Sequence, residues 1–149
     1  MKLLGFIILF SLSGLNQSVD WTIYYDKEHI PESLMKVLQV SFSKDKFNIA
    51  NPDEKFNGTD AILDMTLPFK KLIFLANQDE DWRLLYKQGG FAAAKFLIQC
   101  KISENDSVYN FSISRVPFET ETNDSVSKYI EEGRLKPQYV PVIYKSMDN

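Results

Sequence analysis

The sequence predicts an α+β fold: a single domain in which an antiparallel β-meander of about four to six strands packs against one or two helices. Three segments of alternating polar and apolar residues between Trp82 and Pro117 indicate the meander. Gly89-Gly90 and Asn105-Asp106 separate these segments as turn signals. Two other stretches place apolar residues at helical spacing and indicate the helices.

The N-terminal segment has the pattern of a secretory signal. Met1-Lys2 is followed by the apolar run LLGFIILFSLSGL, which is too short to span a bilayer core of about 30 Å. We therefore expect residues 1–18 to be a signal peptide cleaved near residues 13–18, and residues 19–149 to form the α+β domain. A secreted or periplasmic location follows, without a stable membrane anchor after cleavage. A buried first strand or an uncleaved anchor are the alternatives.

Charge and cysteine content restrict the function. The chain has 17 Lys and Arg against 20 Asp and Glu, a formal net charge of −3, which argues against nucleic acid as a partner. The single cysteine, Cys100, excludes an internal disulfide. Cys100 lies on the apolar side of the central meander segment, so we expect a buried, unreactive thiol.

The first half of the chain predicts a strand, a helix and a short strand. Trp21, Ile23 and Tyr25 alternate with polar residues and are expected to face inward. Pro31 begins a helix over about residues 32–42, although residues 38–43 also alternate as a strand would. Residues 46–50 are a short strand candidate. Residues 61–67 are ambiguous between helical turn and strand.

Residues 70–77 are apolar on both sides, so this strand is expected to be covered at least in part on both faces. A loop at Asn77-Gln78-Asp79 would pair Phe74 with Trp82 and add the strand to the meander. The acidic run that follows, up to Asp81, is expected to be a solvated hairpin loop.

The even-numbered residues of the meander are the more apolar set and are expected to face inward. A three-residue loop, Gln88-Gly89-Gly90, pairs Trp82 with Phe96 and requires positive φ at Gly90. The rival two-residue loop would place Arg83 opposite Phe96.

The last third predicts one more hairpin strand, a helix and an extended tail. A two-residue turn at Asn105-Asp106 sets the inward residues of the second and third meander segments opposite each other: Ile98, Cys100 and Ile102 against Ile113, Phe111 and Tyr109. Thr122 or Asn123 caps a helix that ends at Gly133 and lies on the sheet. The tail is expected to be extended, with Val140, Val142 and Tyr144 reaching a sheet edge.

No catalytic or cofactor motif stands out. The only histidine, His29, lies near Asp26 and Glu28, but no second histidine or cysteine stands at ligand spacing, so we predict no metal and no cofactor. The nucleophile elbow and the phosphate-binding glycine loop are also missing from the sequence.

These observations predict a non-enzymatic, exported binding or accessory module. Its ligand would be an unknown protein, small molecule or glycan. The candidate contact residues are Tyr24 and Phe91, as outward-facing aromatics, and His29. Two alternatives remain: an inhibitor or immunity-type partner protein, and a small enzyme whose curved sheet encloses a pocket containing His29, Asp26 or Asp64.

Overall fold

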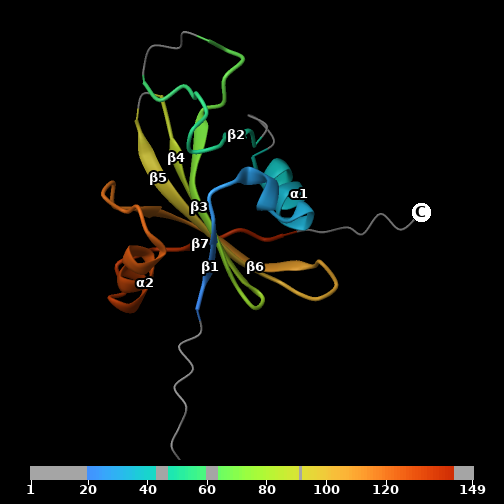
Figure 1. Ribbon diagram of the computed structural model, residues 1–149. Helices are drawn as coiled ribbons and strands as arrows, with labels where there is room; N and C mark the ends of the chain where they lie inside the picture. Colours follow the sequence, from blue (N-terminus) through green and yellow to red (C-terminus); the bar gives the residue numbers. More distant parts are fainter. Residues whose placement is uncertain (1–19, 43–46, 60–63, 91, 143–149) are drawn as a thin grey trace, which may run out of the picture.

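A computed structural model of the chain describes residues 20–42, 47–59, 64–90 and 92–142 (Figure 1). The predicted signal peptide, Phe91 and Tyr144 lie outside these residues. The elements follow one another as β1 (Thr22–Tyr24), the 3-10 helix η1 (Lys27–His29), α1 (Glu32–Ser41), β2 (Ile49–Ala50), β3 (Lys70–Gln78), β4 (Asp81–Gln88), β5 (Ala94–Ile102), β6 (Val108–Val116), α2 (Asn123–Glu131) and β7 (Gln138–Tyr139).

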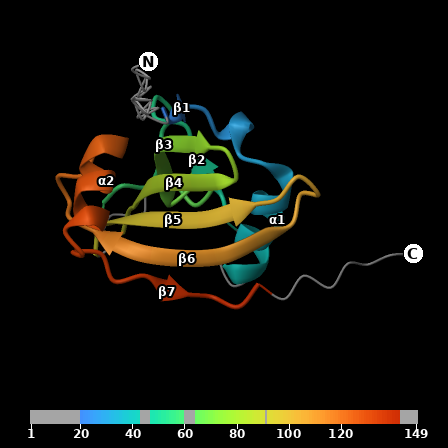
Figure 2. The ribbon, with the colours of Figure 1, turned by 90° about the horizontal axis from the view of Figure 1, so that it is seen from below.

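The strands form one seven-stranded sheet in the order β1-β3-β4-β5-β6-β7, with β2 paired to β3 (Figures 1 and 2). All pairings are antiparallel except that between β2 and β3. The predicted α+β class and the meander are confirmed. The strand number is slightly above the predicted range because β1, β2 and β7 add pieces of two or three residues.

The two helices cover opposite faces of the sheet, so the domain has two apolar cores. Neighbouring residues of a strand point to opposite faces. Leu84 and Ile98 therefore pack with α1, whereas Leu85 and Leu97 pack with Val126 of α2. The even-numbered face is inward, as predicted, and the opposite face is also buried in its centre. In Figure 1 the sheet passes between α1 and α2.

Both predicted helices are confirmed. Leu34 and Leu38 of α1 are fully buried, as their helical spacing requires. Thr122 caps α2 by accepting a hydrogen bond from the Ser125 backbone N–H, and Gly133 follows the helix with φ of 64°.

The register between β4 and β5 differs from the prediction. Trp82 lies opposite Cys100, and Tyr86 lies opposite Phe96, so the pairing of Trp82 with Phe96 is wrong. The backbone N–H of Gly89 donates to Phe69 O at 2.8 Å, which extends β4 beyond the predicted loop start. Gly90 has positive φ, 95°, as expected. The shift is even, so each side chain keeps its predicted face.

The turn between β3 and β4 also differs. It consists of Asp79 and Glu80, and Phe74 lies opposite Leu85 in the core under α2 instead of opposite Trp82. The side-chain amide of Asn77 donates to the carbonyl oxygens of Asp79 and Asp81, which closes this tighter turn. Asp79 adopts φ of 52°, a conformation that aspartate tolerates.

The register between β5 and β6 is as predicted at Ile98 and Ile113 but shifts by one residue toward the turn. A bulge at Asn110, with φ of 52°, causes the shift. Val108 is therefore buried in place of the predicted Tyr109. Cys100 is buried, as predicted.

The tail reaches the outer edge of the sheet, as predicted. β7 pairs with β6, and Val140 and Val142 pack against the core under α1. None of the helices in the described part of the chain is long and apolar enough to cross a membrane.

Candidate functional site

Two of the three predicted contact residues lie together at the start of the domain. The rings of Tyr24 and His29 stack with centroids 4.6 Å apart. Tyr24 was predicted to face outward, and this is wrong: its side chain is partly buried against the core under α1. His29 is exposed. Phe91 lies outside the described residues. Tyr24 and His29 therefore present one mixed aromatic surface at the end of β1.

The acidic neighbours of His29 have local structural roles. Asp26 Oδ1 accepts a hydrogen bond from the Glu28 backbone N–H and caps η1, and its Oδ2 lies 3.9 Å from His29 Nδ1. Asp64 accepts hydrogen bonds from the backbone and hydroxyl of Thr66, which lower the pKa of its carboxyl. The described residues include no cluster of three or more metal-ligating side chains.

A different site lies on the face of the sheet that carries α2. Lys71 of β3 is opposite Lys87 of β4, and Lys87 is opposite Lys95 of β5. We call these three residues the lysine row. Like charges directly opposite each other across strands destabilise a sheet. The row therefore needs compensation or carries a role in binding.

Only one lysine of the row is paired with a carboxylate. Lys95 is 3% exposed, donates to Thr120 O at 2.9 Å and forms an ion pair with Glu121. Within the described part of the chain, no carboxylate oxygen lies within 4.0 Å of the ammonium group of Lys71 or Lys87. Two of the three charges thus lack a direct counter-charge there.

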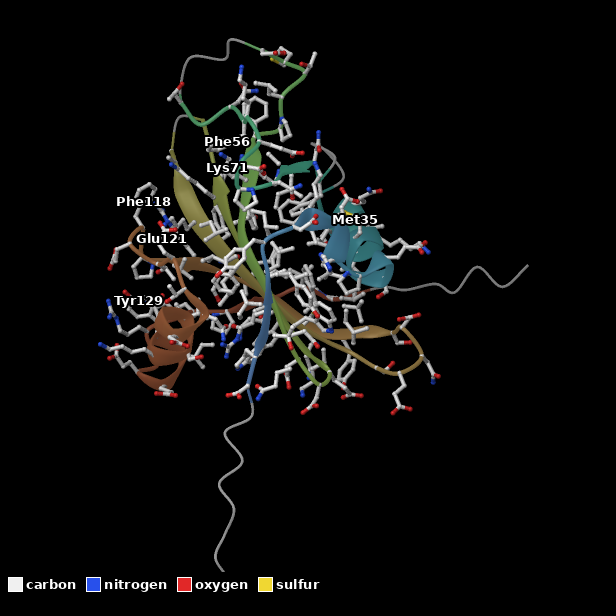
Figure 3. All side chains as sticks on the ribbon, viewed as in Figure 1. Met35, Phe56, Lys71, Phe118, Glu121 and Tyr129 are labelled. Carbon is white, nitrogen blue, oxygen red and sulfur yellow. The ribbon has the colours of Figure 1, made fainter. Side chains whose placement is uncertain are left out.

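Aromatic rings lie beside the unpaired ammonium groups instead. Lys71 Nζ is 4.9 Å from the centroid of Phe56, and Lys87 Nζ is 5.1 Å from that of Phe118. Figure 3 shows Phe56 close to Lys71, and Phe118 next to Glu121 on the segment that precedes α2. Cation–π contacts of this kind contribute about 0.5–1 kcal/mol each at exposed sites.

A groove of about 430 Å³, which we call the lysine groove, is bordered by the three lysines of the row, Phe118 and Glu121. Its rim includes Tyr25, 65% exposed, and Phe118, 55% exposed. The groove holds three lysines against one carboxylate, Glu121. Among the described residues that line it there is no histidine, cysteine or serine, so the groove offers charge and aromatic surface and no nucleophile of those types.

The sequence did not reveal the lysine row, because the row depends on strand register. In the predicted registers Lys87 lies opposite Phe69 on one side and Phe91 on the other, so the three lysines are not neighbours. Tyr25 was predicted to face inward, and this is wrong: β1 ends at Tyr24, and Tyr25 is exposed. The alternation of Lys87 and Lys95 onto the less apolar face was the only available signal.

Comparisons with known proteins add no family or neighbour. No family model matches the chain, and no curated protein and no solved structure matches it.

Proposed function

We propose that the chain is an exported, non-enzymatic binding module, and that the lysine groove takes a ligand carrying a phosphate or sulfate ester beside a ring or apolar portion. The observation that carries this proposal is the lysine row, in which three lysines are neighbours across the strands and one carboxylate, Glu121, is paired with them. The N-terminal apolar run supports export.

The lysine row carries repulsion between like charges in the free protein. Each pair of opposed like charges costs a few tenths of a kcal/mol, and the cation–π contacts of Lys87 with Phe56 and Phe118 offset this cost. Opposed like charges of this kind are typical of sites selected for binding. An anion placed between two ammonium groups replaces their repulsion by attraction.

The charge balance points to a doubly charged group. Lys71, Lys87 and Lys95 against Glu121 leave two positive charges in the groove. A phosphate monoester carries about −1.5 to −2 charges at neutral pH, and lysine binds phosphate as a point charge. Tyr25 and Phe118 then supply ring faces for the body of the ligand, as in sugar or aromatic stacking.

Glucose 6-phosphate, glucose 6-sulfate and glucose, titrated at constant ionic strength and followed by amide NMR shifts, test the proposal. We expect glucose 6-phosphate to shift residues around the lysine groove with saturation, glucose 6-sulfate, which carries a single negative charge, to bind more weakly, and glucose to leave them unchanged. The two esters also separate the phosphate ligand from the sulfate ligand. Lys87→Gln should weaken binding of the bound ester by about tenfold.

Lys136→Gln is the matched control, because Lys136 is exposed and does not line the groove. It should bind the esters as the wild type does. Equal affinity in Lys87→Gln, or shifts of the same residues with glucose, would contradict the proposal.

Lys87→Gln is also expected to change stability. At low ionic strength the free energy of unfolding should change by less than about 1 kcal/mol, because the repulsion removed from two neighbours offsets the loss of two cation–π contacts, with Phe56 and Phe118. At about 1 M salt the variant should become less stable relative to the wild type, since the Debye length falls to about 3 Å and the repulsion in the wild type is screened. Urea unfolding at both salt concentrations measures this. A stability change that does not depend on salt would contradict the repulsion within the lysine row.

A further inference from the structure

A second cavity lies on the same face of the sheet, four residues along β4 from the lysine row, and its volume is about 670 Å³. Arg83 lies in its lining. We call this cavity the Arg83 pocket. Its size is within the range of small-molecule sites, roughly 300–1,000 Å³.

The guanidinium of Arg83 is held in a fixed plane. Its carbon lies 4.0 Å from the centroid of the Trp21 ring, so the two groups stack. Its Nη1 donates to Asn123 Oδ1 and to Ser127 Oγ, both at 2.8 Å. The side chain is therefore ordered before any ligand arrives, which lowers the entropic cost of binding.

The charge of Arg83 is not neutralised by a direct partner. Within the described part of the chain, no carboxylate oxygen lies within 4.0 Å of the guanidinium. Asp81, the carboxylate that interacts electrostatically with Arg83, forms its ion pair with Lys101 at 2.9 Å instead. Burial lowers the pKa of Arg83, and Asp81 opposes this effect. The guanidinium is thus partly desolvated with little compensation.

The anchoring of α2 uses only one of the three guanidinium nitrogens. Nε is buried without a hydrogen-bond partner, and Nη2 has no hydrogen-bond partner among the described residues. A neutral donor could hold Asn123 and Ser127 equally well. The anchoring role therefore does not account for a charged, forked side chain at this position.

The rest of the lining defines the ligand. Arg83 and Lys101 against Asp81 leave one positive charge, and Gln99 adds a polar group. The exposed ring of Tyr139 belongs to the same lining, as does Trp21. The Asn110 bulge, with φ of 52°, also borders the pocket, and bulges of this kind often lie beside functional sites.

We propose that the Arg83 pocket binds a small monocarboxylate with a planar or apolar body, whose carboxylate contacts the guanidinium of Arg83. A carboxylate can accept hydrogen bonds from Nη2, the guanidinium nitrogen that is neither buried nor engaged with α2, and one negative charge matches the pocket. This site is separate from the lysine groove and does not depend on the function proposed for it.

Benzoate, with neutral benzamide as its isostere, is the probe. In NMR titrations at constant ionic strength, benzoate should shift the Trp21 indole and Arg83 side-chain resonances with saturation, and benzamide should not. Arg83→Lys keeps the positive charge but has a single nitrogen, which cannot both hold α2 and contact the carboxylate, and it should weaken benzoate binding by about tenfold.

Arg115→Met is the matched control, because Arg115 is an exposed arginine on the opposite face of the sheet. It should bind benzoate like the wild type, and so should Lys87→Gln of the lysine row. If Arg83→Lys does not fold, Gln99→Leu takes its place and should weaken binding severalfold. A linear response to benzoate, an equal response to benzamide, or unchanged affinity in the folded pocket variant overturns the proposal.

Discussion

Replacing Gly89 with alanine is expected to lower the free energy of unfolding by about 3 kcal/mol, one of the largest effects of any small substitution in this chain. A Cβ at Gly89 would overlap the carbonyl oxygen of Asn57 and lie 2.8 Å from the Cα of Gly58. Neither atom can rotate away, because both belong to the backbone. Urea unfolding followed by circular dichroism measures the loss.

The segment after β4 that carries Gly89 and the loop that carries Asn57 are both held in place by hydrogen bonds. The Gly89 N–H donates to Phe69 O, and the Asn57 N–H donates to Pro68 O, each at 2.8 Å. The Asn57 side chain also donates to the carbonyl oxygens of Asp64 and Leu67. The crossing of these segments therefore cannot open without losing several hydrogen bonds.

Gly90→Ala is the control for Gly89→Ala. Gly90 has φ of 95°, and a Cβ added there would have no atom within 4 Å. Only backbone strain of about 1–2 kcal/mol therefore opposes the change. The sequence alone predicts the reverse order, because it indicates positive φ at Gly90 and shows nothing of Asn57. A larger loss for Gly90→Ala would contradict the crossing of the two segments.

Cys100→Asp is expected to cost about 3–5 kcal/mol, because it places an unpaired carboxylate in the core under α1. Cys100 is 4% exposed and lies opposite Trp82. Cys100→Ala, which leaves only a small gap, should cost much less. Comparing the two variants by urea unfolding separates the charge from the lost volume. Similar losses in both would contradict the burial of this side chain.

The native thiol should also resist alkylation. Burial raises the pKa of Cys100 to about 12, and Asp81 adds to this rise, so the reactive thiolate is scarce at neutral pH. Iodoacetamide should label the protein only after unfolding.

The helices and the faces of the meander were predictable because they depend on local periodicity. Leu34 and Leu38 identify α1, and the even positions Leu84, Tyr86 and Ile98 identify the face under α1. Periodicity does not determine loop length and therefore does not determine strand register. A register that differs by an even number of residues still leaves each side chain on its predicted face of the sheet. This is why the β4–β5 faces were right although the register was wrong.

The lysine row and the Arg83 pocket could not be predicted from periodicity, because both depend on strand register and on contacts between distant parts of the chain. The turn at Asp79-Glu80 is closed by Asn77, a side-chain effect that no turn signal in the sequence reports. Arg83 faces Asn123 and Ser127, which are 40 and 44 residues away along the chain. Local sequence patterns therefore do not predict the position of α2 over this part of the sheet.

The pairing of β7 with β6 bears on self-association. β7 pairs with only Ser112 and Ile113 of a nine-residue strand, and a further bond joins Val140 N to Phe111 O (Figure 2). Long open strand edges recruit strands from other copies. The Asn110 bulge and the exposed charge of Arg115 stand on either side of the covered stretch. We therefore expect the short strand β7, the Asn110 bulge and the charge of Arg115 to disfavour the pairing of β6 with a strand of another copy.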